Sequence, residues 1–146
     1  MTVKRCVLFL CTGNSGRSQM AEGLVNAFLG DQYEACSAST APSGNVHPLA
    51  VQVMREIGVD ISHHRSKSAD KFRNMAFDLV VTVCDDAAEN CPVWLGKGHK
   101  THQGFPDPAR IRGRDEKIVS AFRDVRDRMR AQVLDYLRTW EKESRR

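Results

Sequence analysis

A short apolar segment that leads through a glycine-containing loop into a helix constrains this chain more than any other feature. Residues 4–10 (KRCVLFL) have the length and apolar character of a buried strand. Gly13 and Gly16 lie in the loop that follows, and Gly30 ends the next apolar pattern. That pattern has helical spacing and comprises Met20, Leu24, Ala27 and Phe28. A strand, a loop and a helix in this order are the basic unit of an α/β fold.

The rest of the chain repeats this alternation. We expect a strand over residues 33–39, a short helical stretch over 69–75, a buried strand over 79–83 and a short strand near Thr101. A second helix has an apolar face followed by Gly58 as its cap, and its face comprises Ala50, Val53, Met54 and Ile57. A long final helix follows, with an apolar stripe at Ile118, Phe122, Val125, Met129, Val133, Leu137 and Trp140.

These elements predict one domain over residues 1–146, a three-layer α/β sandwich with a central, mostly parallel four-stranded sheet flanked by helices. A chain of this length buries roughly 70% of the surface its unfolded form exposes, enough for a core of its own. In such sheets ligands bind beyond the carboxyl ends of the strands. The loops after Leu10, Val83 and the strand near Thr101 should therefore meet at one edge.

Charge and hydropathy exclude several function classes. The net charge of +4 gathers towards the C-terminus, where 12 Lys or Arg stand against 7 Asp or Glu from Ala109 onward. A basic segment can bind nucleic acid, but here the two signs are mixed along the segment, which favours a solvated helix face. The apolar run at residues 7–10 is far shorter than the ~20 residues of a membrane span or the roughly 7–15 of a signal-peptide core. We therefore expect a cytoplasmic monomer without a membrane or nucleic-acid partner.

The loop at residues 11–18 (CTGNSGRS) has the composition of an oxyanion-binding turn. Successive backbone N–H groups and the start of a helix favour a tetrahedral anion at its centre, and the guanidinium of Arg17 can bind two of its oxygens. The same field favours the thiolate form of Cys11, to which Ser18 can donate a hydrogen bond, while Asn14 can hold the loop. The candidate oxyanion-binding residues are Thr12, Gly13, Asn14, Ser15, Gly16, Arg17 and Ser18. The plainer reading is a buried cysteine at the end of a strand, followed by an ordinary turn.

Residues 11–23 (CTGNSGRSQMAEG) resemble the active-site segment of low-molecular-weight protein tyrosine phosphatases and, more closely, of the arsenate reductases that share their fold. The resemblance continues through residues 60–62 (DIS), 79–84 (LVVTVC) and 104–109 (GFPDPA) and so covers nearly the whole chain. It implies Cys11 as the nucleophile, arsenate as the substrate with phosphate or sulfate as mimics, and no cofactor.

Three positions depart from the family pattern. Gly16 stands where members commonly carry a second cysteine, and the loop at residues 43–45 is one residue longer than in close relatives. Some reductases bind potassium with groups that match Asn14, Glu22 and Ser37 together with an aspartate, and Lys67 stands in the place of that aspartate. We therefore predict no metal, and hypothesise that the Lys67 ammonium takes its role.

Cys84 and Cys91 distinguish a reductase from a phosphatase. Cys84 ends a strand at the expected active edge, and six residues separate it from Cys91. In a helix the two would lie about 10 Å apart, from a rise of roughly 1.5 Å per residue, whereas a disulfide needs Cα atoms within about 7 Å, so the segment must unwind for them to bond. The resemblance implies that they relay the oxidation of Cys11 to thioredoxin or a related redoxin. Zinc binding fits a lone Cys-x6-Cys poorly, and inert thiols are the other reading.

Asp107 lies between Pro106 and Pro108 in a loop expected to face the anion site, where it can act as a general acid. The plainer reading is a surface turn. Phosphatases usually follow this Asp-Pro with aromatic residues that grip a phosphotyrosine ring, whereas Ala109 and Arg110 follow here. A small inorganic anion therefore fits better, although a phosphatase with incidental Cys84 and Cys91, or a non-catalytic oxyanion sensor, stays open.

The remaining cysteines and the histidines carry no assigned role. Cys6 and Cys36 fall inside expected strands, where small thiols are commonly buried. The histidines show no ligand-type spacing, and we place His63 and His64 in a surface loop; the five are His47, His63, His64, His99 and His102.

Overall fold

The computed structural model, which describes residues 3–85 and 94–144, contains one four-stranded sheet with the strand order β2-β1-β3-β4. All three neighbouring pairs are parallel, so the predicted α/β fold class is confirmed. The strands are β1 (Arg5–Leu10), β2 (Tyr33–Ala38), β3 (Leu79–Thr82) and β4 (His99–His102).

Within residues 3–85 and 94–144 the chain also forms three α-helices and two short 3-10 helices, of which the second 3-10 helix and the third α-helix follow the last strand. The α-helices are α1 (Arg17–Phe28), α2 (Pro48–Arg55) and α3 (Asp115–Ser144), and the 3-10 helices are η1 (Ala69–Phe72) and η2 (Pro108–Arg110). The helical stretch expected over residues 69–75 shrinks to η1, because this segment buries only Ala69 and Phe72. A separation of three residues suits the tighter 3-10 turn.

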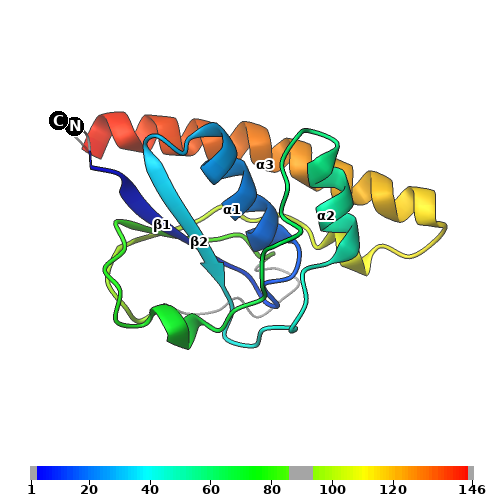
Figure 1. Ribbon diagram of the computed structural model, residues 1–146, viewed down its shortest axis with the longest axis horizontal. Helices are drawn as coiled ribbons and strands as arrows, with labels where there is room; N and C mark the ends of the chain where they lie inside the picture. The colour runs from blue at the N-terminus through cyan, green and yellow to red at the C-terminus, as the bar shows by residue number, and fades with distance from the viewer. Residues whose placement is uncertain (1–2, 86–93, 145–146) are drawn as a thin grey trace.

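Different elements pack on the two faces of the sheet. Val7 and Phe9 point to the face on which α1, α2 and α3 pack together, and Figure 1 shows these helices on one side of β1 and β2. Leu8, Leu10 and their neighbours point to the other face, where η1 and the aromatic rings near it form a second, smaller core. This alternation follows from the two-residue period of a strand.

The end of α1 differs from the sequence prediction. Ala27 and Phe28 were expected on the buried face, but both are exposed, and Leu29, just after the helix, is buried instead. Because the chain turns inward at Leu29, Phe28 is left outside, where the guanidinium of Arg130 lies 4.5 Å from its ring centroid.

The end of α2 follows the prediction. Gly58 has φ +80°, and the N–H groups of Gly58 and Val59 donate to the carbonyls of Arg55 and Met54. This pair of hydrogen bonds is a Schellman motif, in which glycine accepts the left-handed backbone that ends the helix.

An ion-pair group joins α2 to α3. Arg123 donates to both carboxylate oxygens of Glu56, and Arg126 donates to Glu56 Oε1 and to the Val53 carbonyl. The hydrogen bonds from Arg123 and Arg126 lower the pKa of Glu56 to about 2 although burial opposes them.

In the described part of the chain, none of the helices has the length and apolar character that crossing a membrane requires.

Candidate active site

The loops that follow β1, β3 and β4 meet at the carboxyl edge of the sheet. The Val83 N–H donates to the Leu10 carbonyl beyond the end of β3, and the Phe105 N–H donates to the Val83 carbonyl. Residues 11–18 and Asp107 therefore lie at the same edge, as the topology of a parallel sheet requires.

The backbone of the loop at residues 11–18 turns its carbonyls outward. The carbonyl oxygens of four successive residues, 12–15, all accept hydrogen bonds from groups outside the loop or from the helix that follows. The donors are Ser39 Oγ for Thr12, Ser43 N and Ser66 Oγ for Gly13, Gln19 Nε2 for Asn14 and His47 N for Ser15. Because each peptide unit points its N–H opposite to its C=O, this arrangement directs the N–H groups to the inside, as an anion site needs.

A chain of hydrogen bonds runs from Asn14 through Ser18 to Cys11. Asn14 adopts φ 48°, is fully buried, and donates from Nδ2 to Ser18 Oγ over 2.8 Å. Ser18 Oγ lies 2.8 Å from Cys11 Sγ, and its hydroxyl proton can donate to the sulfur when Cys11 is a thiolate. The amide oxygen of Asn14 accepts from Gln19 Nε2 and from the Lys67 N–H, which holds the strained residue in place.

Arg17 is 3% exposed and is held from two sides. Its Nη1 donates to the Phe105 carbonyl over 3.0 Å, and its Nη2 donates to Thr12 Oγ1 over 3.4 Å. The same Nη2 lies 3.6 Å from Asp107 Oδ2. The guanidinium is thus fixed at the first turn of α1, beside the loop.

Asp107 has one oxygen that is structural and one that faces the site. Oδ1 accepts from the Ala109 N–H over 2.9 Å and caps η2, whereas Oδ2 lies near Arg17 and 3.8 Å from Arg110 Nε. The cap orients the carboxyl and leaves Oδ2 available for proton transfer.

These groups surround a pocket of about 100 Å³. It is lined by Cys11, Thr12, Gly13, Ser15, Gly16, Arg17, His47, Asp107, Ala109 and Phe122. Typical small-molecule pockets span about 300–1,000 Å³, so this one suits a small inorganic anion. A Cβ on Gly16 would meet Phe122 Cε1 at 3.8 Å, an ordinary contact, so packing does not require glycine there.

Sequence reasoning missed His47 and Phe122 as pocket residues. His47 precedes the proline that begins α2, and its ring lies 4.6 Å from that of Phe122. The signal was weak, because Phe122 belongs to the apolar stripe of α3 and His47 is a single histidine outside any motif.

Gln19, Glu22, His64 and Lys67 form a polar cluster next to the loop at residues 11–18. We expected His64 in a surface loop, but its side chain is largely buried in this cluster. The side chain of His64 is 10% exposed, and its Nδ1 lies 3.2 Å from Glu22 Oε2 and 3.1 Å from Gln19 Oε1. Burial lowers the pKa of His64 although Glu22 opposes this. The Lys67 ammonium lies 3.6 Å from Glu22 Oε1, which also accepts from Ser37 Oγ. A lysine ammonium thus stands among the groups named for a potassium site.

The cysteines fall into two classes. Cys6, Cys11 and Cys36 are free thiols, whereas Cys84 is disulfide-bonded and fully buried. Burial and nearby carboxylates raise the pKa of Cys6, and raise that of Cys36 to about 11, which makes both poor nucleophiles. Cys91 lies outside the described residues.

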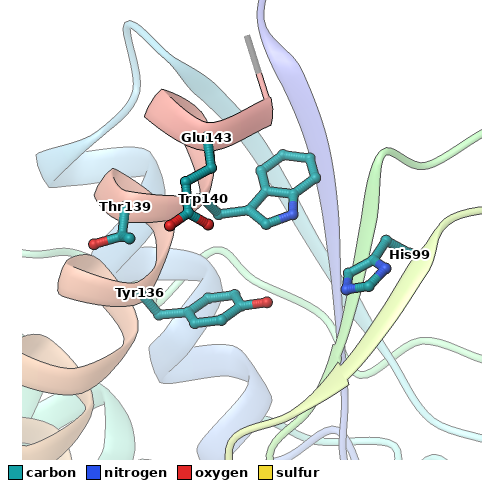
Figure 2. A pocket seen from close by; sticks show the side chains of 5 residues that line it. All are labelled: His99, Tyr136, Thr139, Trp140 and Glu143. Atoms are coloured by element: carbon teal, nitrogen blue, oxygen red, sulfur yellow. The ribbon is translucent and has the colours of Figure 1, made fainter. Parts of the chain in front are cut away.

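A second hollow, of about 380 Å³, lies between β4 and the end of α3. Figure 2 shows Tyr136 and Trp140 projecting from α3 towards β4, where His99 faces them; Thr139 and Glu143 complete the lining. It holds none of the predicted site residues.

Comparison with known proteins gives consistent matches. A family model described as low molecular weight phosphotyrosine protein phosphatase matches residues 6–146. An arsenate reductase of Halalkalibacterium halodurans is 43% identical over 136 residues, which are 93% of this chain and 97% of that protein. A solved arsenate reductase in the phosphate binding state has a TM-score of 0.74 at 27% identity and covers 92% of this chain and 98% of its own. A thioredoxin-dependent arsenate reductase of Corynebacterium glutamicum has a TM-score of 0.64 at 30% identity, over 97% of this chain and 63% of its own.

Proposed function

The chain belongs to the low molecular weight phosphotyrosine protein phosphatase family, and from this premise we propose that it reduces arsenate to arsenite at Cys11. One observation carries the proposal: a free cysteine with its Sγ 2.8 Å from the Ser18 hydroxyl oxygen lies at a pocket of about 100 Å³ beside a fixed arginine. Relatives named arsenate reductase support the same substrate.

The first step is attack of the Cys11 thiolate on arsenic. Arg17 and the inward N–H groups of the loop hold the oxygens of arsenate and stabilise the charge that develops on them. Asp107 transfers a proton to the oxygen that leaves, so that water departs and a covalent sulfur–arsenic bond forms. Arsenic remains pentavalent at this stage.

The second step moves two electrons to arsenic. The Cys84 thiolate attacks the Cys11 sulfur, the sulfur–arsenic bond breaks, and its electron pair stays on arsenic, which leaves as trivalent arsenite. A disulfide between Cys11 and Cys84 remains, and Cys91 resolves it by pairing with Cys84. The proposal is supported by a free Cys11 together with a disulfide-bonded Cys84, the combination expected after the relay.

An external dithiol protein then reduces the disulfide and returns the enzyme to its starting state. Thioredoxin is the proposed reductant, supported by the thioredoxin-dependent relative from Corynebacterium glutamicum. In the proposed setting the protein works as a cytoplasmic monomer, where such reductants keep thiols reduced.

A phosphatase is the second candidate, because the family description names that activity and Cys11, Arg17 and Asp107 suit both reactions. The pocket lining favours the reductase: Ala109 follows the Asp-Pro pair at the rim, where an aryl ring would need a larger apolar contact. A small residual hydrolysis of aryl phosphates is expected, since phosphate fits the same loop but does not accept the electrons.

Mass spectrometry of cysteine pairing after one arsenate turnover without reductant tests the relay. We expect stoichiometric arsenite and a disulfide between Cys84 and Cys91. Cys84→Ser should stop redoxin-coupled turnover yet keep aryl phosphate hydrolysis, while Cys36→Ser, a matched free thiol outside the pocket, should keep both. Undiminished arsenate reduction by Cys84→Ser under thioredoxin supply would refute the relay.

A further inference from the structure

We propose that His47 is a further substrate-binding residue, whose Nε2–H donates a hydrogen bond to an oxygen of the oxyanion held over Cys11. This inference rests on the proposed function, because it concerns the same pocket. It adds to Arg17 and the loop N–H groups a neutral donor from a separate element, the start of α2.

One backbone hydrogen bond and one ring contact fix where the ring of His47 lies. Its own N–H donates to the Ser15 carbonyl over 3.0 Å, which ties the start of α2 to the oxyanion loop. The ring then packs on Phe122 at 4.6 Å between centroids and 37° between planes, and lines the pocket together with Cys11 and Asp107. Because it is packed on one side and tied at the other, the ring has little freedom to leave the pocket wall.

The hydrogen bond at the other ring nitrogen determines the tautomer. His47 Nδ1 accepts from the Leu49 N–H over 3.1 Å as the N-cap of α2, and an accepting nitrogen carries no proton. The neutral ring therefore carries its proton on Nε2. Among the contacts of the described residues, Nε2 has no hydrogen-bond partner, which leaves it for a ligand in the pocket that the ring lines.

The surroundings keep the ring neutral. Burial lowers the pKa of His47, and the nearby carboxylate of Asp107 opposes this only in part. Protonation of Nδ1 would also break the cap, because the Leu49 N–H would then face a second donor. Near neutral pH the ring is thus a donor at Nε2 without a charge.

A purely structural cap does not explain this side chain. Asn, Asp, Ser and Thr are the preferred N-cap residues, and each supplies the oxygen that the Leu49 N–H needs without a ring. The imidazole adds a second polar atom, Nε2, to a ring that lines the pocket. Replacing it with a short N-cap residue separates the two roles, because the cap survives and the donor is lost.

The test is phosphate binding to the reduced protein at pH 7.5 by titration calorimetry, with His47→Asn as the main variant. We expect binding about tenfold weaker, in line with a hydrogen bond to a charged group, and a KM for arsenate raised by a similar factor with kcat within about twofold. His47→Ser, a second capping residue, should behave alike, and the exposed His99→Asn on β4 should match the unmodified protein.

The outcomes separate this inference from the function on which it rests. If His47→Asn and His47→Ser bind phosphate within twofold of the unmodified protein, His47 is a cap and nothing more. If the unmodified protein binds neither phosphate nor arsenate, the oxyanion site itself is refuted, and the role of His47 with it. A melting temperature within a few degrees of the unmodified protein shows that weaker binding in the variants does not come from unfolding.

Discussion

Replacing Asp107 by asparagine separates the chemical role of this side chain from its structural one. The amide oxygen of asparagine can keep the hydrogen bond that Oδ1 accepts from the Ala109 N–H, so η2 keeps its cap. The change removes the acid at the Oδ2 position, 3.6 Å from Arg17 Nη2. The variant therefore loses a proton donor while the loop stays in place.

The loss of the chemical role should change the free energy far more than the loss of the structural role. Loss of a positioned general acid lowers a rate by about 10²–10⁴, which is about 3–5 kcal/mol in the barrier. The lost ion pair to Arg17 is partly open to solvent, since Asp107 is 23% exposed, and contributes about 1 kcal/mol or less to folding. A change of that size moves the melting temperature by about 2–4 °C in a chain of this length.

Single-turnover release of arsenite is the decisive assay, with thermal unfolding and phosphate binding measured beside it. We expect the rate to fall at least a hundredfold while phosphate binds equally or more tightly, because a negative charge has left the anion site. Asp60→Asn is the matched control: its carboxyl also accepts a backbone N–H two residues on, from Ser62, but lies outside the pocket. A rate for Asp107→Asn within threefold of the unmodified protein would show that another group supplies the proton.

Three further changes test the site and the fold. Ser18→Ala should slow alkylation of the loop cysteine by iodoacetamide at pH 7 about tenfold or more, because the thiolate loses a hydrogen bond; an unchanged rate would contradict the assigned donor. Hydrogen bonds from Arg123 lower the pKa of Glu56 to about 2, so this pair stabilises the fold above about pH 4.5 and is lost as pH falls towards 2. The urea midpoint of Glu56→Gln should therefore depend less on pH between 5 and 3, and parallel curves would refute the pair. Gly23→Ala would place a Cβ 2.6 Å from Ile61 Cγ2 and should cost about 1–3 kcal/mol, measured by urea unfolding; an equal midpoint would mean that the contact relaxes freely.

Much of the fold could be predicted because local signals agreed with one another. The apolar runs that became β1 and β3 lie in the middle of the sheet, and the stripe of α3 from Ile118 to Trp140 extends over about six turns with its central residues buried. The prediction for the last turn of α1 was wrong for a physical reason. Ala27 and Phe28 keep the helical spacing, but the buried turn at Leu29 fixes the end of the helix, and tertiary packing decides such ends.

The site, too, contains residues that the sequence predicts and residues that it does not. Cys11, Arg17 and Ser18 follow from their place between a strand and a helix, because the loop that joins them has little freedom. His47 and His64 lie far away in sequence, and only the packing of α2 and of the segment after it brings them to the loop. No local pattern marks a residue whose role depends on a contact with another part of the chain.

Gly16 bears on how this protein withstands peroxide. A cysteine at that position would be close enough in sequence to trap a sulfenic acid on Cys11 as a disulfide within the loop. With glycine there, that rescue has to come from a sulfur outside the loop, and delay allows further oxidation to the sulfinic acid, which is irreversible for most proteins. Because Cys11 is only 2% exposed, an oxidant larger than water has little access to the sulfur, and this low exposure limits the first oxidation step.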